Sequence, residues 1–113
     1  MSEEIQLEGI GVAPGVLETI ATLAAEQVPG VAAVQSKGMS GLVGRAPSRG
    51  VAVTISDEGA LNVQVHIAAR YGTPLRSIAT DVQKSIADAL ESQTGQRAAS
   101  IDVFVDSIVF PEE

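Results

Sequence analysis

The sequence contains no cysteine, so disulfides, thiolate metal sites and cysteine nucleophiles are excluded. Aromatic side chains are scarce, because Tyr71, Phe104 and Phe110 are the only ones. No stretch approaches the roughly 18 consecutive apolar residues of a membrane-spanning helix, and the N-terminus lacks the basic and apolar regions of a secretory signal. We therefore expect an aliphatic core with little room for a deep pocket. We also expect a cytoplasmic protein that reaches a membrane only through a partner.

Basic residues are few as well. Fourteen acids outnumber seven bases, and the net charge is −7. Nucleic acids and anionic membranes attract basic surfaces, so we expect neither nucleic-acid binding nor direct membrane insertion. The exception is the stretch from Lys37 to Arg49, which holds three bases and no acid.

Glycine is concentrated in the same part of the chain. Residues 38–50 contain four glycines and no useful periodicity, which predicts a mobile loop between two strands. Glycine-rich turns can bind anions through backbone N–H groups, but the Gly-Lys-Ser/Thr motif of a phosphate-binding loop is missing. Three interpretations stay open: a plain flexible connection, docking onto an acidic partner, and contact with a nucleotide or RNA.

Two amphipathic helices are predicted. Residues 14–28 place apolar side chains three or four positions apart, with Pro14 in the first turn and Pro29 directly after the last apolar residue. Residues 74–94 follow the same spacing, and Gly95 closes the second helix. The many alanines of the first helix would allow it to approach a sheet closely.

Strict alternation predicts the strands. Residues 61–71 alternate apolar and polar side chains, which is typical of a strand with one buried face and one face that is wet or contacts a partner. Residues 51–56 alternate in the same way, and a turn at 57–59 would join the two strands. The only histidine, His66, falls on the polar face.

A last strand is predicted over residues 100–110. Its alternation slips at Ser107, where a β-bulge would return Ile108 and Phe110 to the core face. Left on the opposite face are Asp102, Phe104 and Asp106. A further short strand is predicted over 31–37, and residues 1–11 would form one short strand or stay loose.

The apolar faces of the two helices and of the sheet can bury one another. A chain of 113 residues has room for a single core, so we expect one domain over residues 1–113. The predicted class is α+β: a two-layer sandwich in which two helices pack on one face of a mostly antiparallel sheet of about four strands.

Three short motifs occur in a characteristic order. They are Val28-Pro29-Gly30-Val31 after the first helix, Tyr71-Gly72 at a strand end, and Thr94-Gly95 before a valine-rich strand. With these motifs the chain resembles, from about Ile5 to Phe110, the alkaline shock protein family of envelope stress proteins, found mainly in Gram-positive bacteria. The resemblance implies a small non-catalytic α+β protein tied to cell-envelope stress and alkaline tolerance. It also implies protein partners, such as a membrane anchor protein, and it brings no catalytic motif, metal or cofactor.

His66 has competing interpretations. It could act as a general base that Asp102 or Asp106 orients, as in a nucleophilic triad, or it could bind a metal or contact a partner from the polar face. The chain has no Gly-X-Ser-X-Gly nucleophile elbow, and a flat sheet face offers little shelter from water. We therefore expect no enzyme and no catalytic residue.

Phe104 interrupts an otherwise polar face. It marks a slipped register, a contact surface, or a site covered by the N-terminal segment or the 38–50 loop. Arg70 could pair with Asp102 or Asp106 if their strands are neighbours. The candidate partner-contact residues are His66, Arg70, Phe104, Asp102, Asp106, Lys37, Arg45 and Arg49.

The expected function is a non-enzymatic interaction or scaffold role in cell-envelope homeostasis. Partners would be an anchor protein or related family copies, and a homo-oligomer is plausible because a free strand edge can pair with another chain. The alternative is a small α+β nucleic-acid-binding module, since small sheets of this kind can present a face to RNA.

Overall fold

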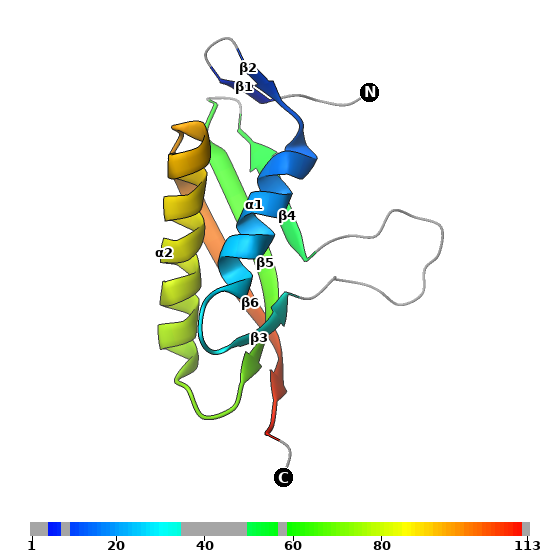
Figure 1. The fold of residues 1–113 in the computed structure, drawn as a ribbon, viewed down its shortest axis with the longest axis vertical. Helices are drawn as coiled ribbons and strands as arrows, with labels where there is room; N and C mark the ends of the chain where they lie inside the picture. The colour runs from blue at the N-terminus through cyan, green and yellow to red at the C-terminus, as the bar shows by residue number, and fades with distance from the viewer. Residues whose placement is uncertain (1–4, 8–9, 35–49, 57–58, 112–113) are drawn as a thin grey trace, which may run out of the picture.

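A computed structural model describes residues 5–7, 10–34, 50–56 and 59–111 (Figure 1). The chain forms two helices and six strands within these ranges. In chain order they are β1 (Ile5–Leu7), β2 (Ile10–Val12), α1 (Pro14–Glu26), β3 (Val31–Val34), β4 (Val51–Ile55), β5 (Leu61–Arg70), α2 (Leu75–Thr94) and β6 (Ala98–Val109).

The main sheet is built around β5. Strand β4 pairs antiparallel with residues 61–65 of β5, and β3 pairs antiparallel with residues 67–69. Strand β6 runs parallel to β5 from one end to the other. Because a strand has only two edges, β3 and β4 follow one another along one edge of β5 while β6 occupies the other (Figure 1). The mostly antiparallel four-stranded sheet is thereby confirmed.

The parallel pairing of β6 depends on α2. Parallel neighbours need a long crossover, and the 20-residue helix α2 provides it between β5 and β6. The helix ends where the sequence predicts, because Gly95 adopts a left-handed conformation (φ 79°) and donates its N–H to the carbonyl of Glu91. Strands β1 and β2 pair with each other as a separate small sheet. The sequence predicts either one short strand or a loose segment in this region.

The core lies between the sheet and the two helices, which both cover the same face (Figure 1). Every second side chain of β5 from Leu61 to Ala69 was predicted to face the core, and all of them are buried. Helix α1 presents mostly alanines to the core, and Ser85 of α2 donates a hydrogen bond to the carbonyl of Ala24 at 2.8 Å. The small side chains therefore let α1 lie close to both α2 and the sheet.

The predicted bulge in β6 is confirmed. Val105 pairs with Ile67 and Ser107 pairs with Ala68, so Asp106 is the extra residue on β6. Ile108 returns to the core side as expected.

Four side chains that the strand and helix patterns place on the core face are exposed instead: Ile55, Tyr71, Leu75 and Phe110. Tyr71 and Phe110 each follow the last residue of a strand, at one end of the β5–β6 pair. Their rings contact each other, with centroids 5.0 Å apart. Leu75 is the first residue of α2, so it lies at the edge of the layer that the helix covers.

Candidate functional site

One face of the main sheet carries neither of the two described helices (Figure 1). We call it the uncovered face, and define it by the polar-side residues of the two long strands. From β5 and β6 these are Asn62, Gln64, His66, Arg70, Ser100, Asp102, Phe104 and Asp106. The alternation along β5 places these side chains opposite to the buried row, as predicted, except that Ala68 on the same side is also buried, with 3% exposure.

His66 lies at the centre of this face and touches two β6 residues. The register sets it directly opposite Phe104, and the two rings stack with centroids 4.8 Å apart at an angle of 19°. Its Nδ1 lies 3.0 Å from Oδ2 and 3.2 Å from Oδ1 of Asp106. An Nδ1–H group donates to the carboxylate in this arrangement. We call these three residues the His66 cluster.

The His66 cluster is partly open to solvent. The side chain of His66 is 20% exposed and that of Asp106 is 39% exposed, while Phe104 is 42% exposed. The imidazole is thus shielded by the neighbouring ring and strands, and neither described helix covers it. The ring contact and the carboxylate both restrain the imidazole.

The cluster resembles the orienting half of a catalytic triad, because a carboxylate holds an imidazole. A triad also needs a hydroxyl or thiol that hydrogen-bonds to the other ring nitrogen. Among the described residues the imidazole hydrogen-bonds to Asp106 alone. Nor do the described ranges contain a group of three or more His, Cys, Asp or Glu side chains that could hold a metal ion.

The ion pairs proposed for Arg70 are absent from the described part of the chain. Arg70 pairs in register with Val109, on the far side of the bulge, whereas Asp106 lies beside His66. Asp102 lies opposite Gln64. The two strands are neighbours, but their parallel register separates Arg70 from both aspartates, so neither of the two possible pairs forms among the described residues. The basic residues Lys37, Arg45 and Arg49 lie outside the described residues.

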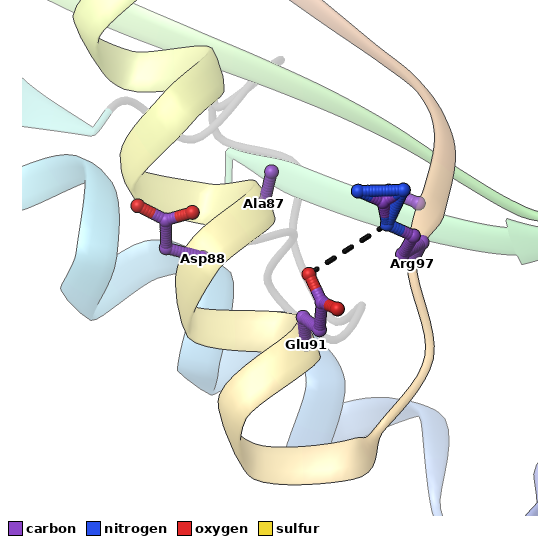
Figure 2. Close-up of a pocket in the computed structure, with 5 residues that line it drawn as sticks. Ala87, Asp88, Glu91 and Arg97 are labelled. Carbon is purple, nitrogen blue, oxygen red and sulfur yellow. Dashed lines mark ion pairs between the residues drawn. The ribbon is translucent and has the colours of Figure 1, made fainter.

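A small pocket not singled out from the sequence lies where α2 turns into β6. Figure 2 shows Glu91 of the helix pointing toward Arg97, with Asp88 and Ala87 one turn earlier. Its volume is about 210 Å³, and the Arg97 Nε lies 3.7 Å from Oε1 of Glu91. Both side chains are mostly exposed, and such ion pairs are worth little. Its lining residues include no hydroxyl, thiol or imidazole side chain.

Replacing Asp106 with asparagine is expected to lower the free energy of unfolding by less than about 1 kcal/mol, because the His66–Asp106 pair is partly exposed and screened by solvent. Urea denaturation measures the change. The matched control is Asp102→Asn on the same strand and face, where no ion pair is lost within the described residues. A loss above about 2 kcal/mol for Asp106→Asn alone would contradict this, since only buried pairs have such effects.

Comparison with solved structures supports the fold. The chain is similar to the MamM CTD in a manganese form, with 16% identity, a TM-score of 0.50, and coverage of 82% of this chain and 96% of that one. A nickel form of MamM CTD matches with the same identity and TM-score over 87% of this chain and 99% of that one. At this identity the likeness concerns the fold alone.

Comparison with known sequences identifies the family. The chain is 30% identical over 112 residues to the uncharacterized protein YqhY of Bacillus subtilis (strain 168), across 96% of this chain and 82% of that protein. Within the described residues, neither helix combines the length and hydrophobicity needed to cross a membrane. A family model described by a cell envelope-related function matches residues 2–110, and the chain therefore belongs to the alkaline shock protein 23 family.

Proposed function

We propose that this chain is a non-enzymatic interaction module that supports cell-envelope homeostasis by binding a protein partner through its uncovered face. The observation that carries the proposal is Phe104, an exposed aromatic ring fixed against His66 at the centre of a polar face. Aromatic side chains dominate the binding energy of many protein interfaces.

The His66 cluster favours binding because it is held in place before a partner arrives. Stacking on His66 restricts the Phe104 ring, and the hydrogen bond to Asp106 restricts His66. A side chain that is already fixed loses less conformational entropy on association. The face therefore offers a partner a preformed apolar anchor within a polar surround.

The charge of the uncovered face disfavours the nucleic-acid alternative. Asp102 and Asp106 flank Phe104 at alternate positions of β6, and carboxylates beside the aromatic ring would repel a phosphate backbone. Family membership supports a role at the cell envelope. The chain would reach the membrane through a partner, such as an anchor protein, from a cytoplasmic location.

Replacing Phe104 with serine is expected to reduce capture of the specific partner by about tenfold or more, the effect of losing an interface anchor. The measurement is a quantitative pull-down from cells that contain the natural protein, with nuclease added so that RNA cannot bridge. Leu23→Ser is the matched control, because Leu23 is 55% exposed and lies on α1, across the core from this face.

Retained capture by Leu23→Ser together with loss by Phe104→Ser would support the uncovered face. The opposite pattern would assign the interaction to α1 and overturn the proposal. Material that is captured only in a parallel sample without nuclease would instead favour nucleic-acid binding.

A further inference from the structure

We infer that the partner of the uncovered face supplies an extended segment that adds as a strand to the free edge of β6 and sets basic side chains against Asp102 and Asp106. This inference rests on the proposed function and names the chemistry of the partner. It follows from three features of β6: a free backbone edge, an incompletely buried apolar row, and alternating acids.

The outer edge of β6 is free of strand pairing in the described part of the chain. Strand β6 pairs with β5 along one edge, and none of the other described strands pairs with it. A row of N–H and C=O groups along such an edge is a template for another extended chain. At 12 residues, β6 is the longest strand described.

The apolar row of β6 is less well covered than that of its neighbour. Ile101, Val103 and Val105 are only partly buried, although they pack against the core. The β5 residues paired with them are Val63, Val65 and Ile67, and all three are fully buried. A further strand beside β6 would remove more of this apolar row from water, which favours its addition.

Two local features limit where a strand can add. The side-chain amide of Gln83 on α2 donates to the main-chain carbonyl of Ile101 at 2.8 Å, so that carbonyl is already occupied. At the other end, the bulge at Asp106 interrupts regular pairing. The accessible segment is therefore 102–106, which reads Asp-Val-Phe-Val-Asp.

The side chains of this segment select a basic partner. On the uncovered face, Asp102 and Asp106 flank Phe104, so a paired strand meets acid, aromatic and acid at alternate positions. Opposite charges on facing positions stabilise paired strands, and like charges destabilise them. An antiparallel pair of two β6 strands centred on Phe104 would set Asp102 of one copy opposite Asp106 of the other. The occupant is therefore a segment with two Lys or Arg residues four positions apart and an apolar residue midway between them.

A synthetic peptide tests this chemistry. The probe is Thr-Lys-Val-Leu-Val-Lys-Thr, which presents Lys, Leu and Lys on one face and two valines on the other. Titrated into the intact ¹⁵N-labelled protein, it is expected to shift the amide signals of residues 101–106. An analogue with Glu in place of both lysines should bind about tenfold more weakly or worse, because two attractive pairs become repulsive.

Backbone methylation tests the strand geometry. In a strand, alternate N–H groups point to opposite edges. One peptide is N-methylated at both valines, and a second at the leucine and the last lysine. We expect one of the two to bind like the parent and the other to lose binding. Equal effects of the two methylation patterns would contradict strand addition.

A variant of the protein tests the charge at the site. Asp102→Lys should weaken binding of the lysine peptide by about tenfold, whereas Asp88→Lys, an exposed position on α2, should leave it unchanged. Equal weakening by both variants would show that the net charge of the protein alone explains the effect, and would overturn the inference. A concentration-dependent dimer that blocks the peptide would make the occupant a second copy, and would also overturn it.

Failure of this inference is distinguishable from failure of the proposed function. If Phe104→Ser abolishes partner capture while the lysine peptide does not bind, the proposed binding through the uncovered face is supported and the inferred strand addition is contradicted. If the peptide binds at residues 101–106 but Phe104→Ser leaves capture unchanged, the edge binds basic strands while the natural partner lies elsewhere.

Discussion

Replacing Ile67 with alanine is expected to lower the free energy of unfolding by about 2–5 kcal/mol, as truncation of a fully buried Ile does. Ile67 is 0% exposed, and its strand neighbours in register are Val34 on β3 and Val105 on β6. The alanine leaves a cavity that these strands and the helices above them cannot fill. Equilibrium unfolding in urea, followed by circular dichroism, measures the loss.

Phe104→Ala is the contrast on the opposite face of the same sheet. Phe104 is half exposed, and its main contact is the stacked ring of His66, so its loss is expected to cost at most about 1.5 kcal/mol. Equal losses for Ile67→Ala and Phe104→Ala would contradict a core confined to one side of the sheet.

Replacing Gly30 with alanine is expected to cost the second-largest amount of stability. Gly30 has φ 101°, where an L-amino acid is strained by about 1–3 kcal/mol. A Cβ there would also lie 2.9 Å from Cγ1 of the buried Ile78. The turn between α1 and β3 has little freedom to shift, because the carbonyl of Gly30 accepts the N–H of Arg70 at 2.8 Å.

Gly72→Ala separates the two contributions. Gly72 has a similar φ of 108°, but a Cβ at this position would meet nothing within 4 Å. We therefore expect Gly30→Ala to lose at least about 1 kcal/mol more than Gly72→Ala, which carries the backbone strain alone. Indistinguishable unfolding midpoints and slopes for the two variants would show that the α1–β3 turn relaxes away from Ile78.

The elements of the fold were predictable from local patterns. The alternation of β5 identified both its buried row and the exposed side of His66, and the slip at Ser107 located the bulge of β6. These predictions succeed because the sheet is amphipathic and one residue of register moves a side chain from core to solvent. The exposure of Tyr71 and Phe110 was not predicted, since alternation does not show where a strand stops.

The pairing of elements was not predictable in the same way. The predicted helix between β5 and β6 permits a parallel pair, but the alternation of β6 shows neither its partner strand nor its register, and this register decides that Asp106 rather than Asp102 reaches His66. The stacking of Phe104 on His66 also depends on this long-range pairing. A partner-contact role for these residues could be proposed from sequence, but their arrangement as one cluster required the sheet.

Site-specific photo-crosslinking in cells tests most directly whether the uncovered face is where the partner binds. A photoreactive phenylalanine analogue replaces Phe104 in one strain and Leu23 in another, and crosslinked proteins are identified after irradiation. We expect a specific protein adduct from position 104 and none from position 23, which lies on the helical side of the core. An adduct from position 23 alone would contradict the account, because the helices would then carry the interaction and the exposed ring of Phe104 would face solvent only.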